Sequence, residues 1–112
     1  MFYTSNTFFG KNSMSLRELL NALRETYCGT LGAEYMYATD QDEKRWWQQK
    51  LESVRSKPNF NADKKKHILG RLTAAEGLER FLHTKYVGQK RFSLEGGESF
   101  IAAMDELIQA AG

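Results

Sequence analysis

Apolar residues recur at helical spacing in several stretches of the chain. Between residues 16 and 27 they fall every three or four positions, as in a helix with one buried face. Ser15 and Glu18 have the Ser-x-x-Glu spacing of a capping box, in which each side chain bonds an amide of the first turn. The pattern therefore predicts a helix from Leu16 to about Tyr27, which Gly29 should end.

A second helix is predicted from about Gln41 to Val54, with Asp40 as its N-cap. Trp47 would lie on the buried face of this helix. Trp46, about 100° further round the helix, cannot serve the same face, so we expect it to meet another domain or subunit. The preceding residues, 30–39, mix aromatic and glycine residues without a period and are interpreted as an irregular, partly buried connection.

Two shorter helices are predicted in the next part of the chain. Asn61 can cap a helix over about 62–71. Thr73 and Glu76 then repeat the capping-box spacing, which indicates the start of a separate helix that runs to about residue 85. Each of these helices has an apolar edge that requires burial.

The stretch after residue 88 changes from a helical to an extended pattern. In the segment 90–94, Arg91 and Ser93 would point to one side and the two apolar residues to the other. Gly96 and Gly97 then allow a sharp turn into a last helix, from about residue 97 to 111. Two cations before a helix start form a natural place for an anion, and the alternative is an ordinary turn.

These elements place the chain in the all-α class, with about five amphipathic helices and one short extended segment. The last helix is the most apolar one and follows an extended segment, so it resembles the opening helix of an α/β unit. Residues 1–14 contain four aromatic side chains without helical period. We expect them to form an extended tail of a larger protein, because a free terminus rarely exposes so many aromatics.

Composition narrows the choice of partners. The chain has 112 residues and a net charge of +2, with acidic and basic residues interspersed, which argues against nucleic acid or an anionic membrane as the main partner. No apolar run approaches the ~18 residues of a spanning helix. The single cysteine, Cys28, cannot form an internal disulfide, which fits a reducing, cytoplasmic compartment.

Few residues are candidates for chemistry. A thiol packed at a helix end is a better interpretation of Cys28 than a nucleophile, because no histidine lies near it in the sequence. His67 and His83 lie sixteen residues apart, with no cysteine or carboxylate at metal-ligand spacing around them. The lysine run 64–66 is interpreted as the solvated start of a helix. We therefore predict no catalytic residue and no metal site from these patterns.

Several sequence segments resemble segments of one enzyme family in their order and spacing. They are Leu16–Leu20, Thr26–Met36, Lys44–Trp46, Leu72–Leu82 and Lys90–Glu98. Together they resemble the first, decarboxylating component of bacterial 2-oxoglutarate dehydrogenase. The resemblance implies a homodimeric, thiamine-diphosphate- and Mg²⁺-dependent enzyme of the tricarboxylic acid cycle. Such an enzyme decarboxylates 2-oxoglutarate and passes the succinyl group to a lipoyl arm of a second component.

The family is many times longer than this chain, and its functional words are absent. It binds the cofactor with a Gly-Asp-Gly motif followed by an Asn pair and handles substrate with a His-Arg-Gly-Arg word, none of which occurs here. The resemblance implies a fragment that is inactive alone. Residues 15–87 would be a helical region, and 88–112 the start of the first catalytic α/β domain, which binds thiamine diphosphate. The alternative is a stand-alone, non-catalytic helical interaction module.

Arg91 is the one substrate-binding candidate. Neighbouring side chains of an extended segment point to opposite faces, so only one of Lys90 and Arg91 should reach into a cleft. Arg91 shares its face with Ser93, and a guanidinium can grip a carboxylate of 2-oxoglutarate bidentately. The alternative is that Arg91 only pairs with Glu95 or Glu98 to fix the turn into the last helix.

Overall fold

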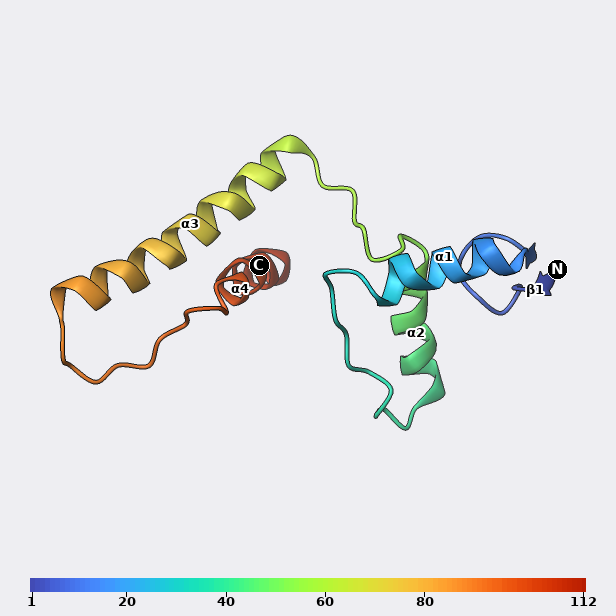
Figure 1. Ribbon diagram of the computed structural model, residues 1–112, viewed down its shortest axis with the longest axis horizontal. Helices are drawn as coiled ribbons and strands as arrows, with labels where there is room; N and C mark the ends of the chain where they lie inside the picture. Colours follow the sequence, from blue (N-terminus) through green and yellow to red (C-terminus); the bar gives the residue numbers. More distant parts are fainter. The chain divides into compact units, whose positions relative to one another are not determined.

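The computed structural model describes all residues from 1 to 112, and most of them are helical (Figure 1). The elements are β1 (Phe2–Tyr3), β2 (Ser13–Met14), α1 (Leu16–Tyr27), α2 (Gln41–Glu52), α3 (Ala62–Lys85) and α4 (Ser99–Ala111). The expected helical class is confirmed, whereas the expected number of five helices is wrong, since there are four and a small sheet. None of the helices combines the length and the apolar composition that crossing a membrane requires.

The chain divides into two compact units, residues 1–59 and 60–112. The first contains the sheet, α1 and α2, and the second contains α3 and α4. The boundaries expected from the sequence, after residues 14 and 87, refer to the longer parent protein and stay predictions.

The aromatic stretch at the start of the chain folds back on itself as a hairpin. β1 and β2 pair antiparallel, with Phe2 opposite Met14. Thr4 is buried and donates a hydrogen bond from its hydroxyl to the carbonyl of Lys11 at 2.6 Å. The stretch that was expected to be extended therefore has local structure of its own.

Glu52 joins this hairpin to α1 and α2. Its Oε2 accepts a hydrogen bond from the backbone N–H of Phe8 at 2.9 Å, and its Oε1 accepts one from the Tyr27 hydroxyl at 2.6 Å. Glu52 is 8% exposed, and a carboxylate so deeply placed is costly unless both oxygens are bonded. Burial, reinforced by the bond to Glu52, raises the pKa of Tyr27, so its hydroxyl remains a donor.

The predicted capping box of α1 is confirmed. The Ser15 hydroxyl accepts from the Glu18 amide at 3.3 Å, and the Glu18 carboxylate accepts from the Ser15 amide at 3.0 Å. The bond from the Ser15 amide, with help from Lys11, lowers the pKa of Glu18 to about 2. The helix ends at Tyr27 as predicted. Its C-cap, Cys28, is exposed, so the predicted packed thiol is wrong, because the cap lies outside the buried face.

The two tryptophans of α2 differ in their surroundings, as expected. Trp47 stacks on the buried Tyr35, with ring centroids 6.4 Å apart. Trp46 packs edge-on against the Trp47 ring and is 50% exposed. A partner for Trp46 stays a prediction. Residues 30–39 form no helix, as their pattern predicted, whereas Val54 lies two residues beyond the end of α2 and is exposed.

α3 is one helix of 24 residues, so the prediction of two helices with a break before Thr73 is wrong. Thr73 caps nothing, and Glu76 pairs with Arg80 one turn later at 2.8 Å instead of bonding back to a cap. The physical reason is that no proline interrupts this stretch, and Gly70 and Gly77 each cost a helix only about 1 kcal/mol. The local start signal is therefore overruled by continuous backbone hydrogen bonding.

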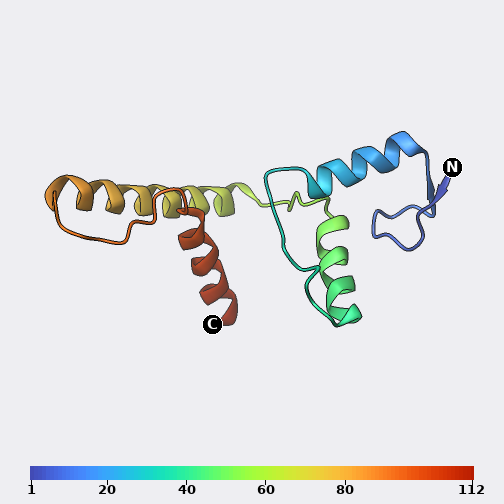
Figure 2. The same cartoon turned by 60° about the horizontal axis from the view of Figure 1, so that its bottom comes forward.

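α4 crosses α3, as Figure 2 shows, and polar side chains of α4 such as Asp105 and Glu106 contact α3. Its apolar stripe, which the sequence pattern predicted to be buried, is largely exposed: Phe100 by 56%, Leu107 by 61% and Ile108 by 65%. Only Ala102 is buried. The predicted α/β context of this helix is untested and stays a prediction. Within this unit, polar contacts and not the apolar stripe hold α4 against α3.

The continuity of α3 can be tested at Gly70. An added Cβ meets no atom within 4 Å there, so Gly70→Ala should stabilise the helix by about 0.5–1 kcal/mol. The measurement is thermal unfolding followed by circular dichroism. Gly88 is the control, because its φ of 83° disfavours any side chain, and Gly88→Ala should lower the melting temperature. A lower melting temperature for Gly70→Ala would contradict a continuous helix.

Candidate anion-binding cleft

The chain reverses direction at the end of α3. The amide of Tyr86 closes the helix by donating to the carbonyl of Leu82 at 3.1 Å, and Lys85 in the last turn suits the negative end of the helix dipole. Gly88 follows with a φ of 83°, a left-handed conformation that glycine adopts without strain. Residues 89–94 therefore return beside α3 (Figure 1).

A cleft of about 250 Å³ lies at this reversal. It is lined by Leu82, Tyr86, Gln89, Lys90 and Arg91. Its wall combines the apolar surface of the last turns of α3 with two cationic side chains. A carboxylate with a short apolar chain matches this lining, because the cations can bind its oxygens while the helix contacts its carbon atoms.

Arg91 is held at the cleft by a carboxylate from α3. Its Nη1 donates to Glu79 Oε2 at 2.7 Å, and its Nη2 lies 3.9 Å from Glu95 Oε1. The Ser93 hydroxyl donates to the same oxygen of Glu79 at 3.1 Å. Arg91 and Ser93 therefore contact the same carboxylate, as expected for two residues on one face of the returning segment.

The structure corrects two statements about this segment. Lys90 also lines the cleft, so the prediction that only one of the two cations reaches it is wrong. The reason is that residues 89–94 have no regular strand geometry and do not alternate strictly. Of the structural partners predicted for Arg91, Glu95 is present only at the longer distance, and Glu98 bonds the amide of Gly96 instead.

Glu79 was missed by the sequence analysis. It lies twelve residues before Arg91, on a different element, so no local spacing connects the two. A signal was nevertheless present. Glu79 precedes Leu82 by three residues and Tyr86 by seven, which places it on the same face of α3 as the helical wall of the cleft.

The start of α4, where an anion was expected, is not part of the cleft. The Glu98 carboxylate accepts from the Gly96 amide at 3.2 Å, and the amides of Phe100 and Ile101 bond carbonyls of the preceding turn. These backbone groups are therefore already satisfied within the chain. The expectation of an anion at this helix start has no support in the structure.

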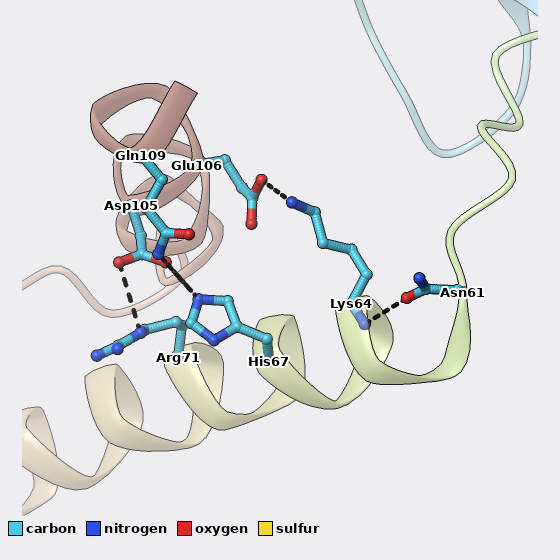
Figure 3. Close-up of polar contacts among 7 residues, drawn as sticks. All are labelled: Asn61, Lys64, His67, Arg71, Asp105, Glu106 and Gln109. Atoms are coloured by element: carbon cyan, nitrogen blue, oxygen red, sulfur yellow. Dashed lines mark hydrogen bonds and ion pairs between the residues drawn. The ribbon is translucent and has the colours of Figure 1, made fainter. Parts of the chain in front are cut away.

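A second polar group joins α3 to α4 (Figure 3). Its members are Lys64, His67 and Arg71 from α3 and Asp105, Glu106 and Gln109 from α4. His67 Nε2 lies 2.5 Å from Asp105 Oδ2, and Arg71 Nε lies 3.6 Å from the other oxygen of Asp105. The bond with His67, supported by Arg71, lowers the pKa of Asp105 against a smaller opposing effect of burial.

Part of this group has the composition of a metal site. Ligand atoms of His67, Asp105 and Glu106 lie within 4.8 Å of one another. The sequence pattern predicted no carboxylate ligand beside His67, and helix packing brings in Asp105 from 38 residues away. Each carboxylate, however, is already paired with a cationic side chain, Asp105 with Arg71 and Glu106 with Lys64. We interpret the group as ion pairs between helices.

Comparison with known proteins gives one consistent result. No protein-family model matches the chain. The chain is 80% identical over 112 residues to the 2-oxoglutarate dehydrogenase E1 component of Cupriavidus necator. It is 51% identical over 111 residues to that of Azotobacter vinelandii and 50% identical over 104 residues to the E1/E2 component of Corynebacterium glutamicum. The chain matches one segment of the 2-oxoglutarate dehydrogenase E1 component.

The resemblance inferred from the sequence is thereby confirmed. The E1 matches cover 100%, 99% and 93% of this chain, so both structural units lie within them. The chain spans only 12%, 12% and 8% of the length of these relatives. The names of the E1 relatives do not say which residues bind substrate, and the role of Arg91 stays a prediction.

The contact between His67 and Asp105 predicts a pH dependence. Because the pKa of Asp105 is lowered in the folded chain, this carboxylate stabilises the fold above its unfolded pKa, and the contribution is lost as the pH falls through the folded pKa. Asp105→Asn should therefore lower the melting temperature near pH 7, and its difference from wild type should shrink below about pH 4.

The measurement is thermal unfolding of both proteins over a series of pH values. Glu34→Gln is the control, because Glu34 is an exposed carboxylate of the other unit without an ion pair. It should leave the melting temperature unchanged at each pH. A difference between Asp105→Asn and wild type that is the same at all pH values would contradict the prediction.

Proposed function

We propose that this chain is a segment of a succinyl-transferring 2-oxoglutarate dehydrogenase. In this proposal the parent enzyme is a cytoplasmic homodimer of the tricarboxylic acid cycle. It decarboxylates 2-oxoglutarate with thiamine diphosphate and Mg²⁺ and transfers the succinyl group to the lipoyl group of a second component. The observation that carries the proposal is 80% identity over the whole chain to a protein named 2-oxoglutarate dehydrogenase E1 component.

This chain lacks the motifs by which the resembled family binds its cofactor and metal. The Gly-Asp-Gly motif, the Asn pair and the His-Arg-Gly-Arg word are absent. In the one group with a metal-like composition, Arg71 and Lys64 pair with the carboxylates and Glu106 Oε1 alone lacks a partner, which is too few free oxygen ligands for Mg²⁺. We therefore assign thiamine diphosphate and Mg²⁺ to other parts of the parent enzyme.

Within the parent enzyme, we assign Arg91 to the binding of a substrate carboxylate. Nη1 of Arg91 is bonded to Glu79, whereas Nε and Nη2 make no hydrogen bond. The side chain is 22% exposed and lines the cleft together with Lys90. A guanidinium edge with two free donors can take a carboxylate bidentately, and Lys90 adds positive charge beside it.

The alternative function is a stand-alone helical interaction module without catalysis. The observation in its favour is the exposed apolar stripe of α4, which requires a covering surface. The rest of the parent enzyme would provide that surface equally well. The reading frame on both sides of this segment separates the two functions, since a frame that continues into a Gly-Asp-Gly word supports the enzyme.

The chain alone should not release CO₂ from 2-oxoglutarate. The expected result follows from the absence of the cofactor and substrate-handling words. The assay supplies thiamine diphosphate and Mg²⁺ and compares the chain with the full-length enzyme at equal molar concentration. Turnover above the protein-free background would overturn this prediction.

In the full-length enzyme, Arg91→Lys should lower kcat/KM for 2-oxoglutarate. Lysine keeps the charge but loses the bidentate fork, and a charged hydrogen bond is worth about 1.5–3 kcal/mol. The control is Arg80→Lys, since Arg80 is a 79% exposed residue of α3 that is outside the cleft. If Arg91→Lys keeps wild-type kcat/KM while its melting temperature falls, the role of Arg91 is structural.

A further inference from the structure

Glu79 is the most enclosed member of the group around Arg91. Its side chain is 12% exposed, compared with 22% for Arg91 and 64% for Glu95. It projects from α3, which is an uninterrupted helix, whereas its partners lie on an irregular segment. The fixed point of the group is therefore Glu79, and the returning segment is held to it.

A single oxygen of Glu79 makes both contacts. Oε2 accepts from Arg91 Nη1 at 2.7 Å and from the Ser93 hydroxyl at 3.1 Å. The Ser93 oxygen in turn accepts from the amide of Glu95 at 3.1 Å. Two side chains and one backbone group of the segment are thus ordered by one helical carboxylate.

This arrangement determines which part of the guanidinium is available. An arginine side chain has several rotatable bonds and loses much conformational freedom when it binds a ligand. Holding Nη1 beforehand removes part of that loss, and it leaves Nε and Nη2 without hydrogen bonds. The charge of Glu79 offsets that of Arg91, while Lys90 still gives the cleft a positive wall.

We propose that Glu79 is a positioning residue, which presents the free edge of Arg91 to a substrate carboxylate. The proposal rests on the proposed function, in which Arg91 binds 2-oxoglutarate. Glu79 does not touch the substrate and acts only through Arg91.

The competing explanation is that Glu79 occupies Arg91 in place of the ligand. A carboxylate that only competed would take the bidentate edge, because that contact is the stronger one. In the structure it takes Nη1 alone and shares its oxygen with Ser93. Removal of a competitor would improve substrate binding, whereas removal of a positioning residue weakens it.

The test is Glu79→Gln in the full-length enzyme. Glutamine keeps the shape and one acceptor oxygen but loses the charge, so KM for 2-oxoglutarate should rise about tenfold while kcat changes less than about twofold. The matched control is Glu76→Gln, one turn earlier on α3, where Glu76 pairs only with the exposed Arg80. The control should keep wild-type KM. A lower KM for Glu79→Gln would overturn the proposal.

Combination with Arg91→Lys separates this proposal from the proposed function. In an Arg91→Lys background, Glu79→Gln should raise KM no further, because the edge that Glu79 presents is gone. If Arg91→Lys raises KM but the KM of Glu79→Gln equals that of the control Glu76→Gln, Glu79 has no positioning role. If Arg91→Lys itself has no effect, the assignment of Arg91 to the substrate fails, and the present proposal fails with it.

Ser93→Ala gives a second variant that does not depend on the stability of Glu79→Gln. It removes one of the two contacts of Glu79 and keeps the ion pair with Arg91. KM should rise in the same direction by about threefold, a smaller change because a neutral hydrogen bond is lost. An unchanged KM for Ser93→Ala, with Glu79→Gln also unchanged or too unstable to assay, would overturn the proposal.

Discussion

The second unit depends on the uninterrupted course of α3. One helix of 24 residues carries His67 and Arg71 near its start and Glu79 and Leu82 near its end, where Tyr86 is its C-cap. A break before Thr73 would separate the contacts with α4 from the wall of the cleft. Because the helix is continuous, the ion pairs that hold α4 and the carboxylate that holds Arg91 lie on one rigid element.

In both units, hydrogen bonds and ion pairs make many of the contacts between elements. The buried apolar residues are few and mostly small, such as Ala22, Ala75 and Ala102, and the large apolar side chains of α4 remain exposed. Hydrogen bonds to enclosed carboxylates therefore define the local arrangement. The carboxylate is that of Glu52 in the first unit and that of Glu79 in the second. Such contacts fix geometry more than they add stability, since a charge must first leave water.

Local signals predicted the elements that depend on adjacent residues. The capping box at Ser15 fixed the start of α1, and the long words of sequence identified the enzyme family. The same local reasoning failed at Thr73, where backbone hydrogen bonding continues through a capping pattern. Glu79 and Asp105 could not be predicted as partners of Arg91 and His67, because tertiary folding brings together residues that are 12 and 38 positions apart.

Glu52 limits which sequences this fold accepts. Its two oxygens receive one backbone donor and one phenol donor, so position 52 demands an acceptor on both sides. Glutamine offers a single acceptor oxygen and would set its amide against one of these donors. Phenylalanine in place of Tyr27 would leave a buried oxygen without a partner. Positions 27 and 52 are therefore chemically linked, and substitution at one restricts what the other can be.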